Sequence, residues 1–418
     1  MKRFLLTSQI VWVLAVSMAE GLFAQDASAQ EQKSHAKHRR YTVVDLGTLG
    51  GPKTNSNGFG VNAAGWVAGS SNLVFNGPQR AFIWYGLDRL FDLGALDGSK
   101  CLTCNSIGYS PNASGEAAIT SETSKKDPNG EDFCFYGTHH QCLAAIWRDG
   151  SMAALPTLPG GHNASAFGLN DQGQVVGFSE KGTPDPTCVM ATPYQKLRFE
   201  AVVWETDGEI RKLRPLPGDT VSVAVGINDN GQAVGWSGLC SNTTSYVAST
   251  GPFAPHAVLW DSDGSPTDLG HLKGERAGVY NVATTINNRG EVGGWACVGP
   301  DTNPVTCIEH AFLWTREKGM QDLGIFPGAI ANGPPCCNTI SNKGEIVGTA
   351  IAATPAFPFN EHALVRQGNE WVELNTLIPA DSGCYLVCAQ GVNDAGEITG
   401  FGVLNGYIHA YLARPTCE

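Results

Sequence analysis

The chain has 418 residues, of which 51 are glycine and only 16% are charged, and its formal net charge is −12. Many glycines and few charges are typical of turn-rich β structure. The acidic balance argues against a nucleic-acid-binding protein, because phosphate binding needs a basic face, and it also disfavours an anionic membrane surface.

The first 24 residues have the pattern of a secretory signal peptide. Met1-Lys2-Arg3 precedes a mostly apolar run over 4–18, which is too short to span a bilayer comfortably. Cleavage is expected after Ala24 or Ala29, and residues 25–40 are interpreted as a flexible polar leader. No second apolar run suggests a membrane anchor. We therefore expect a secreted or periplasmic protein whose folded domain covers residues 41–418.

Three short motifs recur seven times each in this domain. The turn motif Asn-x-x-Gly has its glycine at Gly65, Gly115, Gly173, Gly231, Gly290, Gly344 and Gly396. An alanine-centred strand recurs at Ala81, Ala144, Ala201, Ala257, Ala311, Ala363 and Ala410. A Leu-x-x-Leu motif begins at Leu46, Leu93, Leu155, Leu213, Leu269, Leu323 and Leu374. A period of about 50 to 60 residues that contains only short extended segments predicts a β-propeller with four-stranded blades.

The order of the motifs is permuted at the two ends of the chain. The domain begins on the Leu-x-x-Leu motif at Leu46 and ends on the strand around Ala410. This order is expected for a closed ring in which residues 41–49 supply the outer strand of the seventh blade. A solenoid is the alternative, but it would need capping units and has no use for permuted ends.

The repeated residues are interpreted as structural. The turn asparagine bonds its own backbone and the glycine accepts positive φ. These asparagines include Asn62, Asn170, Asn228, Asn287 and Asn393, and Ser341 takes this position in the sixth blade. A tryptophan that closes the third strand is expected in the core, at Trp84, Trp147, Trp204, Trp260 and Trp314.

Four histidines occupy one repeat position, at His256, His310, His362 and His409. Third strands of neighbouring blades lie far more than about 2 Å apart, so these side chains should not share one metal ion. We expect each of them to support a loop by hydrogen bonds. His139-His140 is a separate pair that weakly suggests a metal ligand or a general base, and no cofactor is expected.

Thirteen cysteines in an exported chain predict disulfides. Twelve of them map to the rim that carries the loops between second and third strands, called here the top; the Asn-x-x-Gly turns lie at the bottom. Cys297–Cys307 and Cys134–Cys142 are the predicted bridges. A bridge between blades, Cys336–Cys388, competes with a local Cys384–Cys388 bridge, and metal binding is the rival reading of Cys101-x-x-Cys104.

The top loops differ from blade to blade and carry aromatic residues. We place a candidate ligand site around Phe133, Tyr136 and Tyr194, because rings beside polar groups on a stapled rim suit a glycan or a peptide. The alternative is that these rings fill the interior of their own loops.

The phrase His310-Ala311-Phe312-Leu313-Trp314, with Asp322-Leu323-Gly324 and the Ile-Asn-x-x-Gly turn, resembles the HAF family of extracellular repeat proteins. The resemblance covers about residues 41–413 and is degenerate in the second and third blades. It implies a secreted bacterial protein without an established activity and supplies no catalytic residues. WD-repeat and kelch propellers are less similar, since their signature motifs do not recur here.

No catalytic motif is found, so the sequence favours a binding or scaffold module over an enzyme. The expected partner is an extracellular carbohydrate or peptide, and the protein is expected to be a monomer. An extracellular polysaccharide hydrolase or lyase is the alternative. An enzyme would need convergent ionisable groups near the pore, whereas the predicted inner strands offer few of them.

Overall fold

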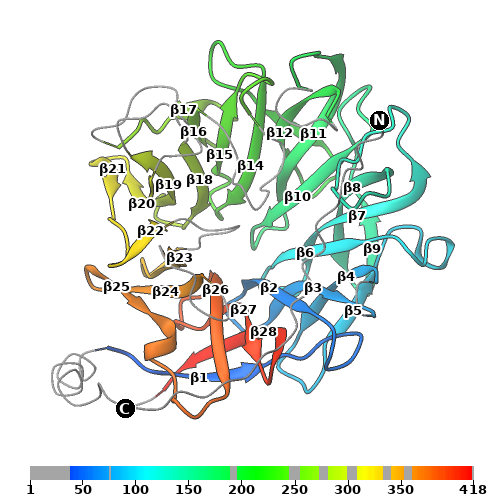
Figure 1. Cartoon of the computed structure of the whole chain (residues 1–418). Helices are drawn as coiled ribbons and strands as arrows, with labels where there is room; N and C mark the ends of the chain where they lie inside the picture. The colour runs from blue at the N-terminus through cyan, green and yellow to red at the C-terminus, as the bar shows by residue number, and fades with distance from the viewer. Residues whose placement is uncertain are drawn as a thin grey trace, which may run out of the picture. The chain divides into compact units, whose positions relative to one another are not determined.

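A computed structural model describes residues 38–74, 77–188, 195–243, 255–272, 281–298, 308–332, 340–352 and 360–416. The predicted signal peptide and most of the leader therefore lie outside the described residues. Residues 39–418 form one compact unit, and their described strands make seven four-stranded antiparallel sheets. These sheets are arranged as blades around a central axis (Figure 1). The seven-bladed, all-β propeller predicted from the sequence is confirmed.

Each of the first four blades runs outward from its inner strand in chain order. Blade one is β2 (Ser56–Val61), β3 (Val67–Asn72), β4 (Gln79–Trp84) and β5 (Phe91–Gly94). Blade two is β6 (Ser106–Pro111), β7 (Ala117–Lys126), β8 (His140–Arg148) and β9 (Ser151–Ala154). Blade three is β10 (Ala164–Leu169), β11 (Val175–Pro184), β12 (Leu197–Trp204) and β13 (Ile210–Leu213). Blade four is β14 (Val221–Ile227), β15 (Ala233–Gly238), β16 (His256–Trp260) and β17 (Pro266–Asp268).

The last three blades complete the ring. Blade five is β18 (Asn281–Ile286), β19 (Val292–Val298), β20 (Ile308–Thr315) and β21 (Gly319–Asp322). Blade six is β22 (Ala329–Asn332), β23 (Ile346–Ala352), β24 (Glu361–Gln367) and β25 (Glu370–Glu373). Blade seven is β26 (Cys384–Val392), β27 (Ile398–Leu404), β28 (Tyr407–Pro415) and β1 (Tyr41–Asp45). Two short 3-10 turns, η1 (Gly98–Lys100) and η2 (Leu374–Thr376), lie between strands.

The N-terminal strand closes the last blade, as the permuted motif order predicts. β1 pairs antiparallel with β28, from Tyr41 opposite Pro415 to Asp45 opposite Tyr411. Tyr41 is buried beside Leu386 and Tyr411 in one apolar cluster. The first strand is therefore the outermost strand of blade seven, and it contributes a buried side chain to the core of that blade.

Close contact between the two innermost strands of a blade explains a glycine in the second strand. A Cβ placed on Gly177 would lie 1.9 Å from the carbonyl oxygen of Ser165, and one on Gly400 would lie 1.9 Å from that of Cys388. Only glycine tolerates such an approach. Aromatic residues pack on the same side as these glycines, since a Cβ on Gly400 would lie 3.1 Å from the Tyr411 hydroxyl. Trp204 and Trp260 are among the largest fully buried side chains. Among the described residues there is no helix long and apolar enough to cross a membrane.

Candidate functional site

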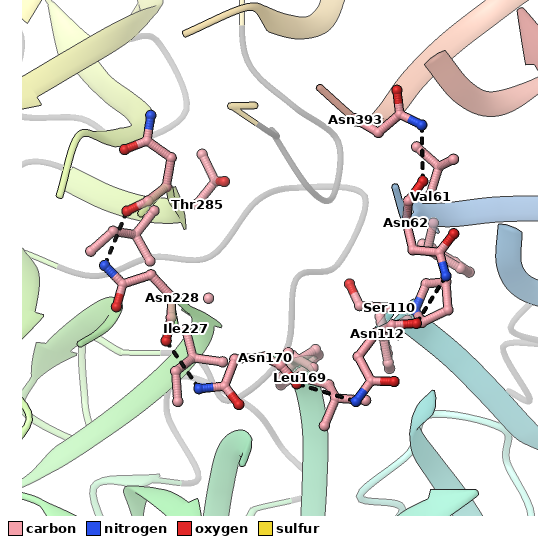
Figure 2. A pocket seen from close by; sticks show the side chains of 18 of the residues that line it. Val61, Asn62, Ser110, Asn112, Leu169, Asn170, Ile227, Asn228, Thr285 and Asn393 are labelled. Atoms are coloured by element: carbon pink, nitrogen blue, oxygen red, sulfur yellow. Dashed lines mark hydrogen bonds between the residues drawn. The ribbon is translucent and has the colours of Figure 1, made fainter. Parts of the chain in front are cut away.

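A cavity of about 470 Å³ occupies the central channel and is lined by the inner strands and the turns that follow them. All seven blades contribute to it, so the repeat forms the wall (Figure 2). A volume of this size lies in the range of small-ligand sites. The channel is therefore the candidate functional site.

At the bottom end of the channel the turn asparagines form a ring of hydrogen bonds (Figure 2). Each side-chain Nδ2 donates to the backbone oxygen at the same turn position of the next blade, and each Oδ1 accepts backbone N–H groups of its own turn. The donor–acceptor pairs are Asn62–Asn112 (2.8 Å), Asn112–Asn170 (3.3 Å), Asn170–Asn228 (3.0 Å), Asn228–Asn287 (3.0 Å), Asn287–Ser341 (3.1 Å) and Asn393–Asn62 (2.9 Å). Because these amides already have partners, they hold the blades together and are poorly placed to bind a ligand.

A bulge in the inner strands sets which side chains line the middle of the channel. The register shifts between Gly58 and Gly60 in blade one and between Ala166 and Gly168 in blade three. The extra residue at such a bulge is Phe59 or Phe167, and both line the cavity. The equivalent lining residues of blades two, four and five, three positions before the turn residue, are Tyr109, Val225 and Thr284.

Three of these residues form an aromatic arc on one side of the channel. The ring centroids of Phe59 and Tyr109 are 5.3 Å apart, and those of Tyr109 and Phe167 are 4.9 Å apart. The residue just before the turn position is aliphatic or proline all around the ring, at Val61, Pro111, Leu169, Ile227, Ile286, Ile340 and Val392. The channel therefore has an aromatic tier, an aliphatic tier and an asparagine tier, in that order towards the bottom.

Few ionisable groups line the described wall of the cavity, and they are Tyr109, Asp171, Asp229 and Asp394. The three aspartates follow the turn asparagine directly, and each accepts a backbone N–H from the preceding blade: Ala113 to Asp171 (2.7 Å), Asp171 to Asp229 (2.9 Å) and Asn342 to Asp394 (2.7 Å). The described lining therefore contains no nucleophile beside a base and no histidine.

The ligand-site residues predicted on the top rim are not all displayed there. Phe133 is only 5% exposed, and its ring packs on Phe178 with centroids 5.3 Å apart. Phe178 in turn stacks on Phe167 at 5.9 Å. Phe133 thus supports the channel wall from behind through Phe178. Because its ring is buried, direct contact with a ligand is not expected for Phe133.

Tyr136 is half-buried, and its hydroxyl donates to Gln79, a residue that lines the channel. Tyr194 lies outside the described residues. The rim site around these residues stays a prediction, and the structure links two of its three members to the channel.

Three disulfides for which both cysteines are described staple the top loops. They are Cys101–Cys104, Cys134–Cys142 and Cys188–Cys240. The last joins blades three and four, and the sequence did not single it out. Cys297 is also disulfide-bonded, whereas its predicted partner Cys307 lies outside the described residues. The local Cys384–Cys388 bridge is a wrong alternative, because the Cys384 thiol is free. Cys336 also lies outside the described residues.

The disulfides argue against the hypothesis that these cysteines bind a metal ion. Two groups of three potential ligands occur among the described residues, Cys101–Cys104 with His140 and Cys188–Cys240 with Asp185. Both pairs of sulfurs are disulfide-bonded, whereas a thiolate is the form of cysteine that binds metal. His139, the other member of the histidine pair, has its Nδ1 3.0 Å from the carbonyl oxygen of Gly130.

Each repeated histidine pairs with a carboxylate across or beside its blade. Nδ1 lies 2.9 Å from Asp219 in His256, 2.9 Å from Asp322 in His310, 2.8 Å from Glu373 in His362 and 2.9 Å from Asp45 in His409. The hydrogen bonds to Asp219 and Asp45 raise the pKa of His256 and His409 above the usual value. His409 and Asp45 connect β28 to the closing strand β1.

A buried carboxylate cluster joins the top loops of blades two and three. Asn163 Nδ2 lies 2.8 Å from Asp127 Oδ2 and 3.0 Å from Glu180 Oε2, and thereby bridges the two acids. Burial, and after it the charge of Glu131, raises the pKa of Glu180 to about 8. The pKa of Glu131 is also raised, chiefly by burial. Every oxygen of Glu180 has a partner, so this cluster is a loop anchor.

No family model matches the sequence, and no curated protein matches it. Solved structures do match. The β-propeller domain of the Trilobed protease from Pyrococcus furiosus has a TM-score of 0.50 at 9% identity, over 88% of this chain and 98% of that one. Puromycin hydrolase has a TM-score of 0.47 at 12% identity, over 87% of this chain and 51% of that one. Oligogalacturonate lyase has a TM-score of 0.40 at 9% identity, over 91% of this chain and 99% of that one. At 9% identity the first of these matches shows the propeller fold alone.

Proposed function

We propose that this chain is an exported β-propeller that acts as a binding or scaffold module, with an extracellular glycan or peptide held in its central channel. The observation that carries the proposal is that the turn residues repeat from blade to blade, whereas the residues that line the middle of the channel differ between blades. The turn asparagines repeat in six blades, whereas the residue three positions earlier is Phe59, Tyr109, Phe167, Val225 or Thr284 in blades one to five. The repeated turn residues are sufficient to hold the blades together. Specificity for a ligand can therefore come from the lining residues that differ between blades.

Export is part of this proposal. The three disulfides of the described residues fit an oxidising compartment. The predicted signal peptide and the resemblance to the HAF family favour the same localisation. The alternative, a polysaccharide hydrolase or lyase, would need a poised acid and base, and the three channel aspartates already accept backbone N–H groups.

The test is a screen of the exported chain on a glycan array and on a peptide library, followed by two variants. Thr284→Trp adds a large ring at a half-buried lining position and should abolish binding in the channel. Replacing Phe133, Tyr136 and Tyr194 together by Ala should weaken binding by about 2–4 kcal/mol if the rim residues are hot spots. The melting temperature of each variant controls for folding.

The two variants separate the sites. Loss of binding with Thr284→Trp alone supports the channel. Loss with the triple Ala variant alone moves the site to the rim if Tyr136→Ala with Tyr194→Ala also loses binding, because Phe133 packs behind the channel wall. Binding that survives both changes contradicts the proposal, and hydrolysis or elimination products from an arrayed polysaccharide would establish the enzymatic alternative.

A further inference from the structure

The charged residues that line the described channel are all acidic. Asp171, Asp229 and Asp394 line the cavity, and the described lining includes no lysine, arginine or histidine. The whole chain carries a formal net charge of −12. A cleft lined by charges of one sign concentrates ligands of the opposite sign. An anionic ligand, such as an acidic polysaccharide or a phosphate ester, is therefore disfavoured in this channel.

The aromatic arc favours a cation as well. An aromatic ring is electronegative on its face, and it attracts an ammonium or guanidinium group within about 6 Å of its centroid. Phe59, Tyr109 and Phe167 supply three rings on consecutive blades, inclined to one another by 48° and 61°. Tyr109 and Phe167 are largely buried, and removal of water strengthens the attraction. Inclined rings that share one wall can contact a single cationic head together.

An acceptor without a partner lies beside the arc. Asn57, on the same strand as Phe59, lines the channel, and its Oδ1 is buried with no hydrogen-bond partner among the residues described. A buried carbonyl oxygen without a donor is costly. If the Asn57 amide turns towards the channel, an ammonium or guanidinium N–H would supply that donor. The Asn57 carbonyl, the aromatic rings and the carboxylates are three separate features, and each of them favours a cationic ligand.

We propose that the channel binds a cationic group on an apolar stem, an alkylammonium or alkylguanidinium. The inference rests on the proposed function, because it assigns a ligand class to the same channel. The three aspartates attract the cation at the bottom mouth, the stem packs on aliphatic residues such as Leu169 and Ile227, and the head reaches the aromatic arc and Asn57. The source is either a free amine or a lysine or arginine side chain of a peptide.

A neutral sugar fits the wall less well. Sugar recognition needs several free hydrogen-bonding groups, and the turn asparagines spend their amides on the neighbouring blade and on their own turn. The aliphatic tier offers none. The peptide reading of the proposed function is thereby favoured over the glycan reading.

The test uses probes that share a four-carbon stem and differ in charge: n-butylammonium, n-butanol and n-butyrate. Binding to the exported chain is measured by ligand-observed NMR titration. We expect n-butylammonium to bind at least about tenfold more tightly than n-butanol, which corresponds to about 1.4 kcal/mol, and n-butyrate not to bind. A tripeptide with a central lysine, compared with its Nε-acetylated form, distinguishes a peptide source from a free amine.

Two variants locate the site. Asp171→Asn, Asp229→Asn and Asp394→Asn together remove the charges and keep the acceptors, since Asn288 and Asn342 already accept the equivalent N–H bonds in neighbouring blades. We expect the affinity for n-butylammonium to fall about threefold or more and to lose its salt dependence. The matched control replaces Asp149, Asp207 and Asp263, which lie on outer hairpins and do not line the channel, by Asn. This control should bind as the unaltered chain does.

Phe59→Leu keeps an apolar side chain but removes one ring, so it should weaken n-butylammonium and spare n-butanol. Equal binding of the three probes, absence of n-butylammonium binding, or unchanged binding in both variants overturns the assignment of a cation. These results leave the channel itself open to the separate Thr284→Trp test. A ligand from the glycan or peptide screen that is lost in Thr284→Trp, while n-butylammonium fails to bind, would retain the binding module and reject its cationic ligand.

Discussion

The side chain of Asn393 in the last blade donates a hydrogen bond to the backbone oxygen of Asn62 in the first blade, at 2.9 Å. These residues are 331 positions apart in the sequence. The ring is therefore closed twice, on its outside by the pairing of β1 with β28 and at the channel by this amide. Five further blade junctions carry the same bond. The junction from blade six to blade seven begins on Ser341, whose short side chain has no amide to donate.

Ser341→Asn should therefore stabilise the propeller. The serine Oγ accepts the N–H of Glu345 at 3.2 Å, as the asparagine Oδ1 does for Glu291 in blade five at 3.0 Å. Asn at position 341 would keep that bond and add a donor to the oxygen of Asn393. We expect a gain of about 0.5–1.5 kcal/mol in the free energy of unfolding, measured by chemical denaturation. Asn393→Ala should cost about 1–3 kcal/mol because a buried acceptor loses its donor. A Ser341→Asn variant that is no more stable than the unaltered chain contradicts this account.

Deletion of residues 41–49 tests the outer closure. The change removes the partner of β28 and the buried ring of Tyr41, and it leaves an open strand edge. We expect a fall in melting temperature of more than about 8 °C and a tendency to aggregate. Removal of residues 25–37, which lie in the predicted leader, is the control and should leave the melting temperature unchanged. A chain that starts at Gly50 with full stability would show that β1 is dispensable.

The fold could be predicted from the sequence because the repeat itself carries the information. The repeat period predicted the blades, and the alternation of small and large residues predicted the strands. The motif order, which starts at Leu46 and ends near Ala410, predicted that the first strand closes the ring. Each of these features is visible in the order and spacing of motifs along the chain. The role of the turn asparagines was predicted in part. Their Asx bonds follow from the turn motif, whereas the bond to the next blade needs the spacing between blades, which no single turn contains.

The channel could not be predicted, because its lining depends on the strand bulge. The bulge at Phe59 re-aims that side chain and breaks the period-two pattern from which the sequence argument assigns faces. A usable signal was present at the position three before each turn residue, where Phe59, Tyr109 and Phe167 follow one another. The burial of Phe133 could not be predicted for a related reason, since an aromatic residue in a variable loop can pack inward.

A second signal in the repeat concerns the residue before the repeated alanine and the residue before the repeated leucine. In blade five they are His310 and Asp322, and in blade three they are Glu200 and Lys212, whose charged atoms lie 4.0 Å apart. The reversal of sign shows that the two positions face each other across neighbouring strands. A structural pair between these two positions, and not a metal site, therefore explains His310, His362 and His409. His256 also pairs with a carboxylate, but with Asp219, which precedes β14.

His310→Ala and His409→Ala should reduce stability to different extents. His310 pairs with Asp322, which is 45% exposed, so solvent screening limits the loss to about 0.5–1 kcal/mol. His409 is 4% exposed, and its second nitrogen lies 3.1 Å from the oxygen of Pro52, so its loss should cost about 1–3 kcal/mol. Denaturation curves measure both effects, and elemental analysis should detect no metal that either variant loses. Stoichiometric zinc or copper in the pure protein that disappears in His310→Ala contradicts the pairing role.

Peptide mapping without reduction tests the staples. We expect Cys101–Cys104, Cys134–Cys142 and Cys188–Cys240 in protein recovered from an oxidising compartment, and we predict Cys297–Cys307 as the bridge of Cys297. Thiol labelling after unfolding should mark Cys384. Free thiols at Cys134, Cys142, Cys297 and Cys307 would reject the stapled rim and the exported compartment together.

Glu180 should make the stability of the propeller fall as the pH rises. Its pKa in the folded protein is about 8, against an ordinary glutamate value of 4.5. Between these values the folded chain holds a proton that the unfolded chain has released. The contribution of Glu180 is therefore fully present below pH 4.5 and is lost as the pH rises towards 8, by roughly 1 kcal/mol for each pH unit. The groups that face Glu180 are Asp127 and Glu131, which disfavour its charge, and the amides of Asn163 and Gln195, which bond it.

Glu180→Gln isolates this contribution, because the amide is uncharged at every pH. Its oxygen can accept the N–H of Asn163, and its NH₂ group can face a rotated Gln195 amide. We expect the free energy of unfolding of the variant, measured in denaturant from pH 5 to pH 9, to fall less steeply than that of the unaltered chain. The matched control is Glu122→Gln at the equivalent position of blade two, where Asn105 makes the same two bonds at 2.8 Å. Parallel profiles for the unaltered chain and Glu180→Gln would contradict this prediction. They would show that Glu180 is ionised in the folded protein at neutral pH. The hydrogen bonds from Asn163 and Gln195 would then be enough to hold the carboxylate of Glu180 beside those of Asp127 and Glu131.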